Sequence, residues 1–153
     1  MALFTGKGDK GTTTAFGCNQ QRISKSSELP EALGCLDELN AFLGFVKMRA
    51  VGEARIANTL RDVQEALFII QAGVAGADKK IRESAVQEVE GLVNGIEQEI
   101  PKLKGFSIAG GTELSALLDV ARTLARRAER RLIAAKEAAV CAPSDETMAY
   151  MNR

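Results

Sequence analysis

The chain has 153 residues, of which 46% are hydrophobic and 26% are charged, a length and composition typical of one globular domain rather than a disordered chain. Its 20 basic residues balance its 20 acidic residues, and this neutrality argues against a nucleic-acid partner, which usually requires a basic surface. The chain contains no histidine, which excludes serine–histidine and cysteine–histidine catalysis and most catalytic zinc sites.

Three cysteines, Cys18, Cys35 and Cys141, form no Cys-x-x-Cys motif. We interpret them as buried free thiols of a reducing compartment, not as a disulfide framework or as metal ligands. The first residues lack the apolar core of a secretory signal, and no apolar run approaches the roughly eighteen residues of a membrane span. We therefore expect a cytoplasmic protein with neither a membrane partner nor a metal site of its own.

Residues 1–27 are rich in Gly, Thr, Ser, Asn and Gln and show no sustained apolar period, which predicts a loop or arm outside the core. The most informative part of this arm is its glycine loop, which reads Thr5-Gly6-Lys7-Gly8-Asp9-Lys10-Gly11-Thr12-Thr13. The spacing matches a Gly-x-Gly-x-x-Gly fingerprint, but no strand and helix flank it, and no lysine follows Gly11 as in a Walker A loop. Its glycines still allow backbone N–H groups to converge on an anion beside two lysines. The alternative is a flexible terminal tail.

Apolar spacing of three and four residues then predicts three helices in succession. The first covers roughly 30–50, with Pro30 in its opening turn, where the missing N–H is no loss. The second follows the apolar seam from Ile56 to Val74. The third runs from Val86 to Ile100 and ends at the following proline, although two glycines weaken it.

A fourth and longest helix begins after Thr112, a candidate N-cap. The alanines on its apolar stripe let a neighbouring helix approach closely. The stripe consists of Leu114, Leu118, Ala121, Ala125, Ala128, Leu132 and Ala135. A short fifth segment, Ser144 to Arg153, starts with a second capping signal. The sequence thus predicts one all-α domain over 1–153, an up-and-down bundle of four long helices and a short fifth over 28–153, preceded by the glycine-rich N-terminal arm.

Basic residues cluster on the fourth predicted helix. Arg122, Arg126 and Glu129 lie on one stripe at i, i+4 and i+7, with three further arginines beside them. Like charges four residues apart repel by a few tenths of a kcal/mol in an isolated helix, so the spacing indicates a neutralising partner. Guanidinium groups suit either a carboxylate on another helix or an anionic ligand. The alternative is a solvated basic face.

Two smaller features also stand out. Asp37 and Asn40 share a face of the first helix close to its leucine seam, so at least one of these polar groups lies beside apolar packing and needs a partner, unless both form a surface pair. Phe106 precedes Gly110 and Gly111 in the connector before the fourth helix. This connector either presents an aromatic ring at the mouth of the bundle or places a core phenylalanine before a turn.

In order along the chain, these motifs resemble the PduO-type ATP:cob(I)alamin adenosyltransferases, and the match runs from residue 4 to the end. Any one of them is weak, but together, in this order and on a predicted helix bundle, they are specific. The matching segments are Thr5 to Thr13, Lys25, Gly34 with Asp37-Glu38-Leu39-Asn40, Gln64 with Leu67-Phe68, Phe106 with Gly110-Gly111, and Ala121-Arg122-Thr123 followed by Arg126-Arg127-Ala128-Glu129-Arg130.

The resemblance implies a five-helix bundle that forms a homotrimer and binds ATP between neighbouring subunits. In such enzymes the arm, here 5–13, wraps the triphosphate with Mg²⁺, and Lys25 also reaches the nucleotide by its position. Asp37 is implied to pair across the subunit interface with Arg122, which would supply the partner that the arginine stripe requires.

The resemblance also assigns roles to five further residues. Arg126 matches an arginine that contacts ATP, Glu129 an acid that holds the arginine face, and Arg130 belongs to the same nucleotide-binding segment. Asn152 matches a nucleotide-contacting asparagine of the last helix. Phe106 matches an aromatic residue that occupies the lower axial face of the corrin and keeps cobalt four-coordinate, so that cob(II)alamin is reduced to the cob(I) nucleophile.

The implied reaction is attack of Co(I) on C5′ of ATP, which yields adenosylcobalamin and releases triphosphate. It needs no histidine, because the nucleophile belongs to the corrinoid and the protein supplies positioning and charge. A reductase and an adenosylcobalamin-dependent acceptor enzyme are possible partners. Two alternatives remain open: a relative without turnover that binds ATP or cobalamin as a sensor or carrier, and an unrelated helical assembly module whose arginines pair with acids at an oligomer interface.

Overall fold

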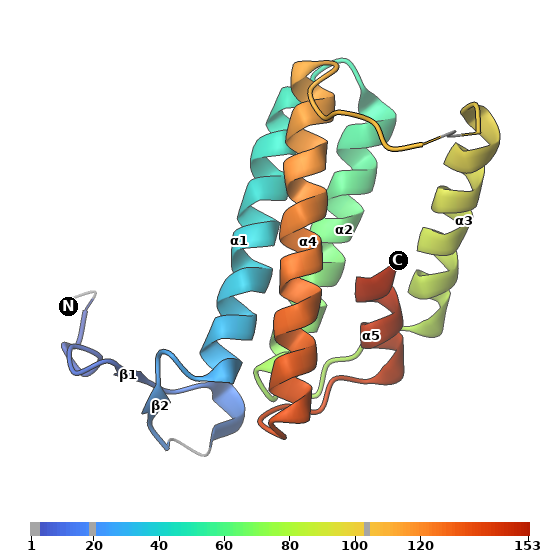
Figure 1. Cartoon of the computed structure of the whole chain (residues 1–153). Coiled ribbons are helices and arrows are strands. Elements are labelled where there is room, and N and C mark those ends of the chain that lie inside the picture. Colours follow the sequence, from blue (N-terminus) through green and yellow to red (C-terminus); the bar gives the residue numbers. More distant parts are fainter. Residues whose placement is uncertain (1–3, 19–20, 103–104) are drawn as a thin grey trace.

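The computed structural model describes residues 4–18, 21–102 and 105–153. The chain folds into an all-α bundle, which confirms the predicted class (Figure 1). None of the helices in these ranges combines the length and apolar character that a membrane crossing requires. The helices are α1 (Glu28–Arg49), α2 (Ala54–Val74), α3 (Glu83–Glu99), α4 (Glu113–Glu137) and α5 (Asp145–Asn152).

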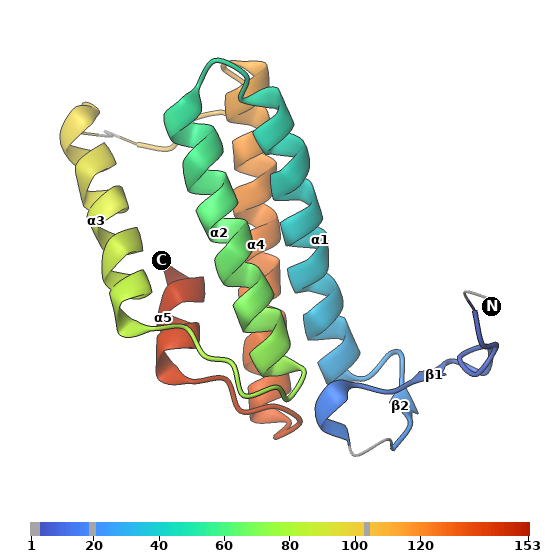
Figure 2. The same cartoon turned by 180° about the vertical axis from the view of Figure 1, so that it is seen from behind.

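Three of the long helices, α1, α2 and α4, stand side by side, and α1 packs against both of the others (Figures 1 and 2). Leu36 of α1, Leu67 of α2 and Leu132 of α4 are almost completely buried between them. Ala128 and Ala135 on the predicted small-residue stripe of α4 have no exposed surface. Their short side chains allow the close approach of α1 and α4 that the sequence predicts, and burial of this stripe fixes the orientation of α4.

Both predicted capping signals are present. The Ser115 N–H donates to Thr112 Oγ1 at 3.1 Å, and the Thr112 N–H donates to Ser115 Oγ at 2.9 Å, which forms a reciprocal capping box at the start of α4. Ser144 Oγ accepts from the Thr147 N–H at 3.2 Å at the start of α5. These bonds satisfy N–H groups that the first helical turn leaves without an intrahelical acceptor.

Helix α3 differs from the prediction in how little of its apolar seam is covered. It stands apart from α1 in both views and packs mainly against α5 (Figures 1 and 2). Val86 is buried, but Val93, Ile96 and Ile100 are each nearly half exposed. The physical reason is that the short α5 lies beside only the first turns of α3. In the later turns Ile96 faces α2 across a cavity of about 450 Å³, so the seam there is only partly covered.

The prediction that residues 1–27 lie wholly outside the core is wrong in part. Strand β1 (Thr12–Thr13) pairs antiparallel with β2 (Ile23–Ser24), and a short 3₁₀ helix, η1 (Phe16–Cys18), lies between them. The Gly17 N–H donates to the Ala75 carbonyl at 2.6 Å, and a Cβ on Gly76 would come within 2.5 Å of Gly17 Cα. Glycine at both positions permits this close contact, which joins the arm to the end of α2.

The cysteines are free, but the expectation that all three are buried is wrong for two of them. Cys35 on α1 is buried, whereas Cys18 in η1 and Cys141 in the α4–α5 connector are half-buried. Connectors run over the surface of the bundle, so their side chains are only partly covered. Partial burial nevertheless raises the pKa of the Cys141 thiol, which keeps it protonated.

Candidate functional site

The β1–β2 hairpin brings the chain back to the glycine loop, so that Lys25 lies beside it. The Lys25 N–H donates to the Gly11 carbonyl at 2.9 Å. The Lys25 ammonium lies against Gly8, where a Cβ would come within 3.1 Å of Nζ. Gly6 and Gly11 have φ angles of 68° and 76°, in the left-handed region that favours glycine. The structure thus brings together Lys25 and the loop, two features that the sequence places 12 or more residues apart.

Two consecutive turns shape the loop itself. The Asp9 N–H donates to the Gly6 carbonyl at 3.2 Å, and the Gly11 N–H donates to the Gly8 carbonyl at 3.1 Å. Thr5 and Lys10 are exposed, and Thr12 and Thr13 form β1. The arm carries this loop away from the N-terminal end of α1 and away from α4 (Figures 1 and 2). The candidate anion site of one chain therefore faces solvent.

The arginine stripe of α4 is neutralised within its own helix in the single chain. Arg122 Nε lies 2.8 Å from Asp119 Oδ1, and Arg126 Nη1 lies 4.0 Å from Glu129 Oε2. Within one chain, acids three residues away on α4 lie in reach of both arginines, and the predicted partner on another helix or in an anionic ligand stays a prediction. Both arginine side chains are 61% exposed, so they remain available to a ligand or to a second copy.

The neighbouring arginines have a different role. Arg127 forms an ion pair with Glu38, and Arg131 Nε lies 3.4 Å from Glu31 Oε1, so both connect α4 to α1. Arg130 is exposed and has no ionic partner in the described part of the chain. The five arginines of α4 therefore divide into two that join helices, Arg127 and Arg131, and three that face outward.

Glu129 is the least exposed member of the stripe, with 14% of its side chain accessible. With the Asn152 amide oriented to satisfy both of its ends, its nitrogen donates to Glu129 Oε1 at 3.2 Å and its oxygen accepts from Arg153 Nη1 at 3.2 Å. Glu129 thus contacts Arg126 of α4 and Asn152 of α5. The structure brings together these three predicted site residues on two helices.

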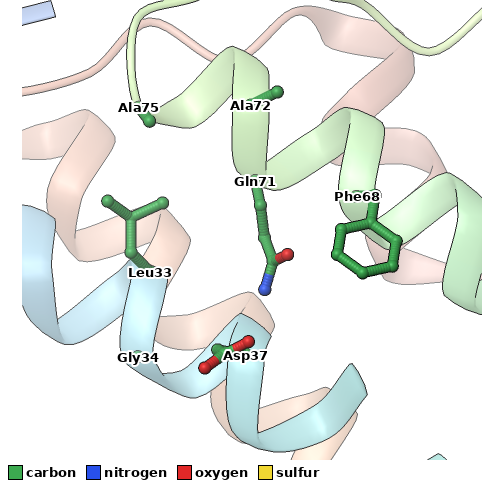
Figure 3. Close-up of a pocket in the computed structure, with 7 residues that line it drawn as sticks. All are labelled: Leu33, Gly34, Asp37, Phe68, Gln71, Ala72 and Ala75. Carbon is green, nitrogen blue, oxygen red and sulfur yellow. The ribbon is translucent and has the colours of Figure 1, made fainter. Parts of the chain in front are cut away.

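Asp37 lies at a shallow depression of about 520 Å³ between α1 and α2 (Figure 3). Figure 3 shows its carboxylate and the Gln71 amide directed toward the space between the helices, with the Phe68 ring beside them. Asp37 is exposed, whereas Asn40 is only 4% exposed and its Oδ1 has no hydrogen-bond partner among the residues that the structure describes. The expected polar group beside apolar packing is therefore Asn40, and the two residues do not form a surface pair.

Phe106 is fully exposed, which rules out the alternative of a core phenylalanine. It lines a cavity of about 530 Å³ together with the glycine-containing connector 105–111, Ser115, Asp119 and Arg122. An aromatic ring and a guanidinium group thus share one cavity at the end of the bundle where α4 begins. The ring suits a large, flat ligand, and the guanidinium group suits a negatively charged group on that ligand or beside it.

The fold is a helix bundle with a glycine-rich arm, and comparison with known families identifies its class. Residues 3–153 match the family model described as cobalamin adenosyltransferase. The chain therefore belongs to the cobalamin adenosyltransferase family.

Several relatives match most or all of the chain. A corrinoid adenosyltransferase of Bacillus subtilis is 33% identical over 160 residues, which cover 100% of this chain and 80% of the relative. A corrinoid adenosyltransferase of Citrobacter freundii is 37% identical, with 99% of this chain and 87% of the relative covered. The PduO protein of Citrobacter freundii is 36% identical over 87% of this chain, but the chain spans only 41% of that longer relative.

Solved structures agree with the sequence comparison. A variant of the PduO-type ATP:corrinoid adenosyltransferase from Lactobacillus reuteri, complexed with cobalamin and ATP, superposes with a TM-score of 0.87 at 28% identity. The superposition covers 99% of this chain and 83% of that one. A second variant of the Lactobacillus reuteri protein, complexed with ATP, gives a TM-score of 0.86.

Arg22 was not predicted as a site residue. It lies directly before β2, and its side chain contacts the glycine loop. Strand pairing places Thr12 opposite Ser24. The sequence signal was an arginine directly before the second strand. This signal points to the glycine loop only once the pairing of the two strands is known.

Proposed function

We propose that this protein transfers the 5′-deoxyadenosyl group of ATP to the cobalt of a corrinoid. The observation that carries the proposal is the combination, in a member of the cobalamin adenosyltransferase family, of a lysine-lined glycine loop, an outward arginine face and an exposed aromatic ring beside it. The first two suit a polyphosphate, and the third suits a planar macrocycle.

The proposed reaction is a nucleophilic substitution at carbon. The electron pair of Co(I) forms a Co–C bond to C5′ of ATP, the C5′–O bond breaks, and the leaving oxygen retains that bonding pair as part of tripolyphosphate. Cobalt is formally oxidised by two electrons and ends as the alkylated Co(III) centre. No proton is transferred in this step, so the lack of histidine is no obstacle.

The protein's part is to bind and stabilise the developing negative charge of the leaving group. Lys7, Lys10 and Lys25 on the arm and Arg126 on α4 provide cations for the triphosphate. Glu129, in contact with Arg126 and Asn152, holds that arginine at the nucleotide. The described residues contain no cluster of three metal-ligating side chains, so Mg²⁺ enters with ATP and is held mainly by phosphate oxygens.

Phe106 is assigned to the corrinoid. A bulky apolar ring below the cobalt displaces an axial ligand and supplies no donor atom in its place. Four-coordinate cobalt(II) is easier to reduce, and Co(I) is the state that attacks C5′. The full exposure of the ring and the cavity that it shares with Arg122 support this role.

We further propose that three copies assemble and that each ATP lies between two of them. Within one chain the arm extends away from α4, the helix that carries the arginine stripe (Figure 1). A neighbouring copy would bring a second arm to the arginine face. In that assembly Asp37 would replace Asp119 as the partner of Arg122.

The trimer proposal is tested with Asp37→Asn. If a buried interface pair forms, removing one partner costs about 3–5 kcal/mol and weakens assembly and ATP use together. Light scattering measures the mass, and an anaerobic assay measures turnover. Glu38→Gln, on the same helix but paired with Arg127 within the chain, is the matched control. A trimer of unchanged stability in Asp37→Asn would contradict the proposed pair.

The adenosyl transfer itself is tested anaerobically with ATP and chemically reduced cobalamin. We expect the spectrum of Co(I) to be replaced by that of adenosylcobalamin at a rate that depends on the protein. Binding of ATP or cobalamin without this change would favour a sensor or carrier, and binding of neither would favour an assembly module. We also propose a cytoplasmic location, because three free cysteines fit a reducing compartment.

A further inference from the structure

Arg22 connects the two ends of the glycine loop through its guanidinium group. Nη2 donates to the Lys7 carbonyl oxygen at 2.6 Å and to the Thr12 carbonyl oxygen at 2.6 Å. Nε donates to Thr12 Oγ1 at 2.8 Å. Lys7 lies within the first loop turn, Gly6 to Asp9, and Thr12 directly follows the second, Gly8 to Gly11, so one side chain connects the first turn to the end of the second.

These bonds also set the direction of the loop amides. In a trans peptide the carbonyl and the next N–H point to opposite sides, so a Lys7 carbonyl that faces Arg22 turns the Gly8 N–H away from it. Among the residues that the structure describes, neither the Gly8 nor the Lys10 N–H has a hydrogen-bond acceptor. The loop therefore keeps donors free for an external anion.

The guanidinium group is suited to this task in a way that an ammonium group is not. Its N–H donors form a rigid planar fork, and here two nitrogens of the fork serve three acceptors. A lysine would retain the positive charge but would present a single flexible point. Arg22→Lys therefore separates the contribution of geometry from that of charge.

We propose that Arg22 is a positioning residue for the polyphosphate chain of the nucleotide. It closes the glycine loop so that the free amides, together with Lys7, Lys10 and Lys25, face one anion, and it acts through the loop rather than on the reacting atoms. This inference deepens the proposed function and rests on it for the identity of the ligand. The closure of the loop by Arg22 is testable without any ligand.

The binding experiment compares Arg22→Lys and Arg22→Ala with Arg61→Lys, a control at an exposed arginine of α2 far from the arm. Calorimetric titration with tripolyphosphate and with MgATP measures affinity, and the anaerobic assay separates KM from kcat. We expect both Arg22 variants to bind each ligand about tenfold more weakly, since charged hydrogen bonds are lost in each. At saturating ATP we expect kcat within about twofold of wild type.

Amide hydrogen exchange without ligand provides a readout that does not depend on activity. We expect faster exchange at Asp9 and Gly11, the N–H groups of the two loop turns, in Arg22→Lys, with unchanged exchange in α1, α2 and α4. Wild-type exchange in the loop would overturn the proposal. So would full ligand affinity in Arg22→Lys, which would assign Arg22 a role through charge alone. If the wild-type protein binds neither ligand, the proposed function fails, and the exchange result still decides whether Arg22 closes the loop.

Discussion

The arm and helix α4 both present positive charge, but different forces hold them in place. On α4, Ala128, Leu132 and Ala135 are fully buried, and ion pairs of Arg127 and Arg131 join the helix to α1. The glycine loop has exposed side chains and is shaped by a few polar bonds and by Arg22. One half of the proposed nucleotide site is thus supported by the core, and the other half by its own hydrogen bonds.

The difference implies that the two halves respond to mutation through different quantities. Changes on the buried side of α4 lower the free energy of unfolding, because they remove packing against α1. Changes in the arm lower the affinity for the nucleotide with little effect on the bundle, because few of its apolar groups are buried. A site built in this way combines a fixed set of cations with a segment that is able to adjust to its ligand.

The largest expected effect comes from deleting residues 1–13. We expect ATP binding to fall below detection, roughly 100-fold or more, because two of the three arm lysines, Lys7 and Lys10, and the glycine loop itself belong to this segment. Helical content and the melting temperature should stay close to wild type. Calorimetry and circular dichroism measure the two quantities, with deletion of residues 1–4 as the control. Unchanged ATP affinity in the longer deletion would contradict the division between arm and bundle.

Leu132→Ala tests the half of the proposed site that the core supports, helix α4. The side chain is fully buried between α4 and its neighbours, so we expect a loss of about 2–5 kcal/mol in the free energy of unfolding. Ile96→Ala on α3 is the matched control, because Ile96 is 48% exposed, and its cost should be about 1 kcal/mol or less. Urea denaturation measures both. Equal costs would show that α3 and α4 contribute alike to the core.

Phe106→Ala tests the connector before α4, which is exposed like the arm but is proposed to bind the corrinoid rather than ATP. We expect ATP affinity close to wild type and a much larger loss of turnover from cob(II)alamin than from pre-reduced cob(I)alamin. Electron paramagnetic resonance should show four-coordinate cob(II)alamin with ATP in the wild type and not in the variant. Equal losses with both cobalt states would remove Phe106 from the reduction step.

The smallest expected effect is a pH dependence of the free energy of unfolding that comes from Tyr150 in the bundle. Burial, followed by the nearby charges of Asp62 and Glu88, raises the pKa of Tyr150 to about 12. Since the unfolded phenol has a pKa near 10, the stability that the neutral phenol gives is complete below pH 10 and is lost as the pH rises toward 12. The loss should reach about 2 kcal/mol.

Tyr150→Phe should remove this decline and leave ATP affinity at pH 8 unchanged. Urea midpoints between pH 8 and pH 11.5 measure it in both proteins. An equal decline in the variant would assign the pH dependence to other groups.

Much of the fold was predictable because its signals are local. The apolar spacing, the Thr112 and Ser144 caps and the small-residue stripe of α4 each act within one helix or one contact. The partly covered seam of α3 was not predictable, because coverage depends on where α5 packs. Periodicity alone predicts an apolar face and does not identify the helix that covers it.

The candidate site was predictable in its residue types and less so in its pairings. The glycine loop and Lys25 were identified from the sequence, but Arg22 required the strand register. The partner of Arg122 within the chain could have been predicted, since Asp119 lies three residues before it on the same helix. Repulsion between the arginines alone, however, does not distinguish a partner in the same helix from one in another subunit.

The fate of the triphosphate tests adenosyl transfer most directly. In an anaerobic reaction of the protein with MgATP and cob(I)alamin, followed by phosphorus magnetic resonance and by absorbance, we expect one tripolyphosphate to be released for each adenosylcobalamin formed. The same ratio should hold in Arg22→Lys at saturating ATP. Release of ADP and phosphate, or of tripolyphosphate without a Co–C bond, would contradict adenosyl transfer as the function of this protein.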